Sequence, residues 1–130
     1  MAIKLRETTR KRIAEPDEVR EAERTRVEIL RLGDVTLARV ILEPGWHWAE
    51  HVKPIVGTES CEIEHLNYVL SGRLRGKLNT GEEFLLEPGD FIYVAPGHDA
   101  WVVGDEPVVM LDIIGGEQYG KAAKEERKAA

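Results

Sequence analysis

Cys61, His65 and His98 are the side chains whose types and spacing favour metal chemistry in this chain. Alternate residues of a β-strand share one face, so Cys61 and His65 point the same way if their strand begins as early as Cys61. His98 follows a Pro96-Gly97 turn further along the chain. If the strands close into a barrel, one thiol and two imidazoles meet inside it. That donor set suits zinc, iron or copper better than magnesium or calcium, so we expect a divalent transition metal there.

A fourth metal ligand is expected from the histidines that precede this set. His51 is the first choice and His47 is the alternative, because the sequence does not show which of them faces the interior. Zinc with three protein ligands keeps a position for water or substrate, as metal-assisted catalysis requires. The competing interpretation is structural. A single cysteine is a common core residue, and interior histidines are often simply hydrogen-bonded.

Three aromatic residues are candidates for a pocket that holds a small organic ligand, because such pockets are largely apolar and aromatic. They are Trp48, Tyr68 and Trp101, of which the last two lie near His65 and His98 in sequence. Packing in the core or at a dimer interface is the alternative role for these side chains.

Short β-strands separated by turn residues must position these groups. Gly33-Asp34 is a two-residue hairpin signal between strands expected at 27–32 and 35–42. Further strands are expected where glycine and proline interrupt apolar runs, at 63–70, 74–78, 83–86, 91–95, 100–103 and 108–114. Within residues 46–60, Trp46-His47-Trp48 alternates and the run from His51 to Ser60 is expected to be a loop. Many short strands with regular turns are typical of a sandwich or barrel.

The length predicts a single domain with two appendages. Residues 1–24 are charged and predict an N-terminal arm or a short helix, in which Pro16 would open one helical turn. Residues 25–116 are assigned to the barrel. Residues 117–130 are rich in Ala, Lys and Glu and predict a C-terminal helical tail.

Charge and composition exclude several classes of function. The formal net charge is −6, with basic and acidic residues interleaved, which argues against nucleic-acid binding. No apolar run is long enough to span a membrane or to act as a signal peptide. The single cysteine permits no intrachain disulfide, so a reducing, cytoplasmic setting is expected.

Two segments carry a resemblance to a known family. Tyr68-Val-Leu-Ser-Gly72 matches the end of the motif G-x5-H-x-H-x(3,4)-E-x6-G, and Pro88-Gly-Asp90 with Ala95-Pro-Gly97 matches the body of G-x5-P-x-G-x2-H-x3-N. Over roughly residues 27–114 the chain resembles the cupins, small jelly-roll barrels. The resemblance implies an all-β, double-stranded β-helix fold, here with the N-terminal arm and the C-terminal helix.

The resemblance also shows where this chain departs from the family's ligand pattern. His65 stands at the family's glutamate position, and Cys61 and Glu59 stand at its first two histidine positions. Ala100 occupies the last histidine position, two residues after His98. The family's set of three histidines and one glutamate is therefore replaced by a substitute set of Cys61, His65 and His98, with His51 or His47 as further members.

The resemblance implies a metal-dependent enzyme of the oxygenase or isomerase class that acts on a small organic molecule. A non-enzymatic module that binds or senses a small ligand is the alternative, because the ligand set is altered. The resemblance also implies a homodimer, and covering the exposed strand edges of a barrel would favour one.

Overall fold

The computed structural model describes residues 7–113. Within this range the chain forms nine strands and two single-turn helices. In chain order they are β1 (Glu18–Ala22), β2 (Thr25–Leu32), β3 (Val35–Leu42), α1 (Trp48–His51), α2 (Lys53–Val56), β4 (His65–Ser71), β5 (Arg73–Leu78), β6 (Glu83–Leu86), β7 (Phe91–Val94), β8 (His98–Val103) and β9 (Val108–Asp112). The C-terminal helix expected at 117–130 lies outside the described residues.

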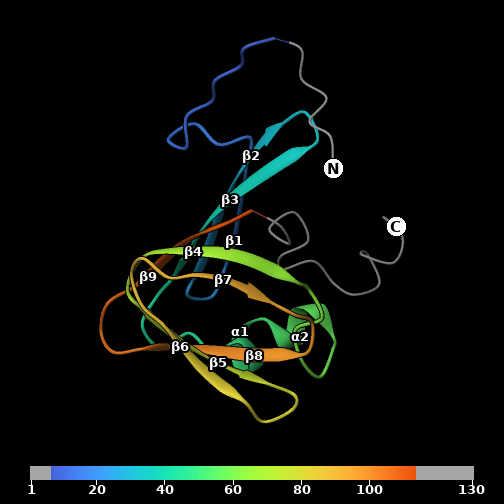
Figure 1. Ribbon diagram of the computed structural model, residues 1–130, viewed down its shortest axis with the longest axis vertical. Coiled ribbons are helices and arrows are strands. Elements are labelled where there is room, and N and C mark those ends of the chain that lie inside the picture. The colour runs from blue at the N-terminus through green and yellow to red at the C-terminus, as the bar shows by residue number, and fades with distance from the viewer. Residues whose placement is uncertain (1–6, 114–130) are drawn as a thin grey trace.

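The strands form two antiparallel sheets that enclose the barrel interior (Figure 1). The larger sheet has six strands in the order β1-β2-β3-β9-β4-β7, and the smaller has three in the order β6-β5-β8. The expected all-β jelly-roll barrel is confirmed. Figure 1 also shows β2 and β3 extending beyond the barrel at one end.

The expected hairpin between β2 and β3 is confirmed, and its register follows from its turn. Gly33 has a φ of 60°, which the two-residue turn requires and which glycine adopts without steric cost. Leu32 then faces Val35, and the pairing continues to Thr25 opposite Leu42. This register places Val27 and Ile29 of β2 and Val40 of β3 in the core.

Two expectations for irregular segments are wrong. Residue Pro16 does not open a helical turn: strand β1 begins at Glu18 and pairs with β2 over its whole length. The Asp17 backbone N–H bonds to Ile29 O at 2.8 Å and so extends this ladder. Residues 46–60 are not only loop, because they contain α1 and α2. Helix α2 has proline in its first turn and ends at Gly57, whose φ is 79°.

The hydrophobic core lies between the two sheets. The larger sheet contributes Val27, Ile29, Val40, Val69, Val108 and Met110, and the smaller contributes Leu74, Leu86 and Val102. Trp46 and Trp48, just before and within α1, are also buried and close one side of this core. The interior is therefore mostly apolar, and the few polar groups within it need partners.

Gly72 joins β4 of the larger sheet to β5 of the smaller one. Its φ is 78°, and a Cβ at this position would overlap Pro107 O and lie 2.7 Å from Val108 Cα. Strand β9 begins at Val108, so the backbone at Gly72 passes directly over the start of that strand. Glycine is thus required here both by the backbone conformation and by the close approach of another strand.

We expect Gly72→Ala to lower the free energy of unfolding by about 2–4 kcal/mol, since strain at positive φ adds to a backbone overlap. Gly81→Ala is the matched control, because Gly81 also has a positive φ but a Cβ added there would meet nothing within 4 Å. That control should cost only about 1–2 kcal/mol. Urea denaturation of both variants measures the difference, and equal losses would contradict the close-packing explanation.

Candidate metal centre

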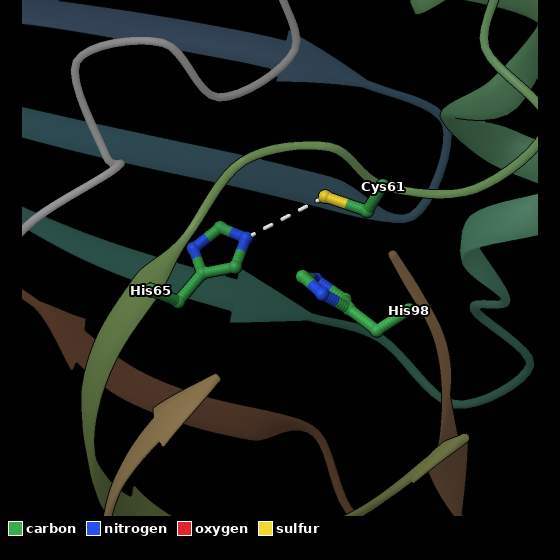
Figure 2. A group of neighbouring side chains, drawn as sticks. All are labelled: Cys61, His65 and His98. Atoms are coloured by element: carbon green, nitrogen blue, oxygen red, sulfur yellow. Dashed lines mark hydrogen bonds between the residues drawn. The ribbon is translucent and has the colours of Figure 1, made fainter. Parts of the chain in front are cut away.

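Cys61, His65 and His98 meet in the barrel interior. One ligand atom from each residue lies within 4.8 Å of the other two, and all three residues are buried. Figure 2 shows the three side chains pointing toward one another. Within residues 7–113 this is the one group of at least three His, Cys, Asp or Glu residues arranged closely enough to hold a metal ion.

Backbone hydrogen bonds hold Cys61 beside the start of β8. The Cys61 N–H bonds to His98 O at 2.7 Å, and the Gly97 N–H bonds to Cys61 O at the same distance. Cys61 precedes β4, so this isolated bridge ties an otherwise irregular segment to the smaller sheet. The bridge places the sulfur next to the His98 ring although 37 residues separate the two positions in sequence.

Asp112 orients His65. The Asp112 carboxylate is only 1% exposed and accepts a hydrogen bond from His65 Nδ1 at 2.7 Å. Strand β9 lies beside β4, with Asp112 opposite Asn67, two residues beyond His65. Because Nδ1–H is committed to the carboxylate, Nε2 faces the cluster and lies 3.6 Å from Cys61 Sγ.

A backbone carbonyl orients His98 in the same way. His98 Nδ1 donates to Ala95 O at 2.7 Å, and this acceptor fixes the proton on Nδ1. The His65 and His98 rings have centroids 5.2 Å apart and planes inclined by 66°. Each imidazole is therefore held at Nδ1, which leaves Nε2 as its ligand atom, as is usual for histidines that bind metals.

The three groups also set one another's protonation. Burial raises the pKa of the Cys61 thiol, but hydrogen bonds and charge from His65 and His98 outweigh burial and lower the pKa to about 6. Burial lowers the pKa of His65, but Asp112 and Cys61 outweigh it and raise the pKa to about 9. Between these two values the metal-free site pairs a thiolate with an imidazolium.

A small cavity of about 40 Å³ lies beside the three ligand atoms. The polar residues on its wall are Cys61, His65, His98, Asn67 and Asp112, and the apolar ones are Trp46, Trp48, Leu74, Phe84, Leu86, Val94, Ala100 and Met110. Since about 10–15 Å³ of such space is enough to hold one water, the cavity has room for about three waters or for one molecule of a few heavy atoms.

His51 and His47 lie outside this cluster, so the expected fourth ligand is not brought to it. His51 Nε2 is 3.1 Å from a Glu23 carboxylate oxygen, and its Nδ1 contacts the His47 backbone. His47 Nε2 is 2.7 Å from Asp99 Oδ2. Asp99 therefore pairs with His47 rather than with His98. The physical reason is that His47, the N-cap of α1, and His51, its last residue, each pair with an acidic side chain away from the cluster.

Of the three expected pocket residues, Trp48 lines the cavity and the other two do not. Tyr68 alternates with His65 along β4, so its side chain points outward, where its ring lies 6.5 Å from that of Phe91. Trp101 has the opposite parity to His98 along β8, and its ring makes a tilted contact with the His47 ring, with centroids 5.4 Å apart, beside a shallow outer groove. Tyr68 and Trp101 were predicted to line the pocket because they lie near His65 and His98 in sequence. Each is an odd number of residues from its neighbouring histidine, so its side chain lies on the opposite face of the strand.

Asp112 is the functional residue that the sequence patterns did not single out. The signal was present, since Asp112 is the one charged residue within the apolar run 108–114. A carboxylate in a strand that is otherwise buried needs a partner, and a buried histidine is one that suits it. Asn67 was also not among the predicted site residues, although it has the same parity as His65 in β4 and lines the cavity.

Comparison with known proteins agrees with this geometry. A family model described as "Cupin domain" matches residues 57–114, a range that contains Cys61, His65, His98 and Asp112. No curated protein matches the chain significantly. The family model and the solved structures support membership of the cupin superfamily, as the sequence motifs implied.

Several solved structures resemble the chain. A serine-to-alanine variant of oxalate decarboxylase from Bacillus subtilis is 27% identical, with a TM-score of 0.55 over 79% of this chain and 29% of its own. A protein of unknown function from Rhizobium leguminosarum is 19% identical, with a TM-score of 0.61 over 84% of this chain and 97% of its own.

A third similar structure is oxalate decarboxylase from Lactobacillus farciminis in complex with formate. It is 20% identical, with a TM-score of 0.57 over 87% of this chain and 35% of its own. The chain thus spans about a third of either oxalate decarboxylase. No helix among the described residues has the length and apolar character that crossing a membrane would need.

We expect the thiolate absorbance of Cys61 in metal-free protein to titrate with a midpoint near pH 6, because the folded pKa lies well below the ordinary value of 9.0. In His65→Gln the midpoint should rise, since burial still opposes ionisation while one favourable hydrogen bond is lost. His51→Gln is the control and should leave the midpoint in place. An unchanged midpoint in folded His65→Gln protein would contradict the pairing.

Proposed function

We propose that this cupin binds one divalent transition metal through Cys61, His65 and His98 and acts as a metal-dependent enzyme on a small molecule. The observation that carries the proposal is the convergence of one sulfur and two imidazole nitrogens within 4.8 Å beside a cavity. Three protein ligands and free space together leave a position for water or substrate. The oxygenase and isomerase classes remain the proposed range of activity.

The donor set fits such a metal. A thiolate and two imidazoles favour zinc, iron or copper, whereas magnesium and calcium prefer oxygen ligands. The low pKa of Cys61 supplies the thiolate near neutral pH, and the Nδ1 hydrogen bonds present Nε2 of both rings. When bound, the ion would supply Lewis-acid chemistry, or redox chemistry if it is iron or copper.

The chain's own residues would orient the ligands and keep the site dry. Asp112 holds the His65 ring and keeps its Nδ1 proton in place, and Ala95 O does the same for His98. The imidazolium of His65 gives up its Nε2 proton when that nitrogen becomes a ligand, so metal uptake and proton release are linked. The apolar walls limit the number of waters beside the reacting molecule.

A non-enzymatic role as a ligand-binding or sensing module is the second candidate. The observation that favours it is the small volume of the cavity, which leaves little room for a substrate together with a co-reactant. Two of the similar structures are oxalate decarboxylases, which raises decarboxylation of oxalate as a third possibility. Oxalate is a dianion, however, and no lysine or arginine among the described residues lines the cavity. Turnover of any small molecule would separate an enzyme from a module that only binds.

We expect the protein to bind one equivalent of Zn²⁺ or Co²⁺ per chain. Cys61→Ala and His98→Ala should each weaken binding by about 100-fold or more, and Asp112→Asn by about 10–100-fold, because it frees the His65 ring. The measurement is competition against a chelator of known affinity. With Co²⁺, a sulfur-to-cobalt charge-transfer band should appear and should be lost in Cys61→Ser.

His51→Ala is the matched control for this experiment, since the His51 side chain is only 8% exposed but lies outside the cluster. It should bind metal as the unaltered protein does. Equal losses in His51→Ala and His98→Ala, or metal binding that survives in Cys61→Ala and His98→Ala, would overturn the proposed site.

The protein is further proposed to act as a cytoplasmic homodimer. Four large apolar side chains are exposed on the outer face of β4 and the edge strand β7: Tyr68, Leu70, Phe91 and Tyr93. Phe91 is 60% exposed and Tyr93 is 54% exposed. A contiguous apolar patch of this kind on a sheet face supports association with a second subunit. A reducing compartment would keep the Cys61 thiol free to bind metal.

Phe91→Glu is expected to shift the protein from dimer to monomer, because it places a charge in the centre of the apolar face. Sedimentation velocity at several protein concentrations measures the change. Ile55→Glu is the control, since Ile55 is also an exposed apolar residue but lies on α2. A monomeric unaltered protein, or an equal effect of Ile55→Glu, would contradict this interface.

A further inference from the structure

The wall of the cavity restricts both the size and the charge of what can enter it. We infer that the ligand of this site is a small neutral molecule, of the size of a simple amide, and that carboxylates such as oxalate are excluded. The inference rests on the proposed function, because it takes this cavity to be the site. It narrows that function to one class of ligand.

The size limit follows from the volume and from the residues that fill the barrel. About 40 Å³ is far below the roughly 300–1,000 Å³ of pockets that bind drug-sized ligands. Trp46, Trp48, Phe84 and Met110 contribute bulky side chains to the wall. A ligand is therefore limited to a few heavy atoms, unless one of these side chains moves or is shortened.

Phe84 is the wall residue that limits the size of the cavity on the side of the smaller sheet's edge. It lies on β6, which is an edge strand, opposite Gly76 of β5. A Cβ on Gly76 would overlap the Phe84 ring, so the glycine leaves room for the ring to lie across β5. Gly76 has no positive φ, and its role is therefore to seat Phe84 rather than to permit a turn.

The charge limit follows from what the wall lacks. Among the described residues, no lysine or arginine lines the cavity, whereas Asp112 contributes a buried carboxylate. The His65 imidazolium is already shared between the Asp112 carboxylate and the Cys61 sulfur, so an anion would lose its hydration there without meeting a net positive charge, which is costly. A divalent ion would be balanced by the Asp112 carboxylate and the Cys61 sulfur, so the loaded site offers an anion no excess positive charge.

The wall does offer hydrogen bonds to a neutral ligand. Trp46 Nε1 and Asn67 Oδ1 are buried and have no hydrogen-bond partner within residues 7–113. Both residues line the cavity, Asn67 from the larger sheet and Trp46 from the segment that bonds to Val102 of the smaller one. A molecule with one donor and one acceptor, such as a primary amide, complements these two groups.

Four probes separate size from charge. Formamide and formate have nearly the same shape but differ in charge, and oxamide and oxalate form the corresponding larger pair. The indole N–H signals of Trp46 and Trp48 report on the cavity in ¹H–¹⁵N spectra, and that of Trp101 outside it is an internal control. Each probe is titrated into both the metal-free and the Zn²⁺-loaded protein.

We expect formamide to shift the Trp46 and Trp48 signals at millimolar concentration and to bind about tenfold or more tightly than formate. Oxamide and oxalate should leave both signals unchanged. In Phe84→Ala oxamide should now shift them, while oxalate should not. Phe84→Leu provides an intermediate opening of the cavity, so the size limit can be tested even if Phe84→Ala does not fold.

Three results would overturn the inference: no response to formamide, formate binding as tight as formamide binding, or binding of oxalate or oxamide to the unaltered protein. These failures are distinct from failure of the metal proposal, because chelator competition measures metal binding without any probe. If the protein responds to formamide but binds no metal, the inferred ligand class stands and the proposed metal centre is wrong.

Discussion

The buried contact between Asp112 and His65 is the interaction on which the barrel interior depends. A carboxylate enclosed by apolar side chains is tolerated only with a partner, and loss of one partner of such a pair typically costs about 3–5 kcal/mol. Here the partner is an imidazolium, because the contact raises the pKa of His65. That positive charge in turn lowers the pKa of Cys61. One carboxylate on β9 thus sets the protonation of a histidine on β4 and of a cysteine before it.

Much of the fold could be predicted from local sequence signals. Turn glycines and strand alternation located the β2–β3 hairpin and the later strands to within a few residues. The same alternation predicted that His65 and His98 face the interior, whereas Cys61 lies before β4 and is placed there by its bridge to His98. What local signals could not supply was the pairing of distant segments. The bridge between Cys61 and His98 joins the segment before β4 to β8, and no pattern near either residue encodes it.

The errors arose where nearness in sequence was used in place of geometry. Tyr68 and Trp101 lie close to the ligands along the chain, but their odd offsets place them on the outer surface. His51 has the right chemistry, yet α1, a helix of one turn, turns its ring toward Glu23. Asp112 was passed over because it looked like an interruption of an apolar strand. In a barrel, such an interruption is itself evidence of a polar interior.

Two bulky wall residues come from a different part of the polypeptide than the donors. Cys61, His65, His98 and Asp112 all fall within residues 57–114, the range that the family model matches, whereas Trp46 and Trp48 precede it. The segment that carries these tryptophans is tied to the smaller sheet by the Val102 N–H to Trp46 O bond of 3.0 Å. Mutational drift in the earlier segment can therefore reshape selectivity while the coordinating half stays intact. A lineage built on this plan has a route to new ligands that does not require rebuilding its chemistry.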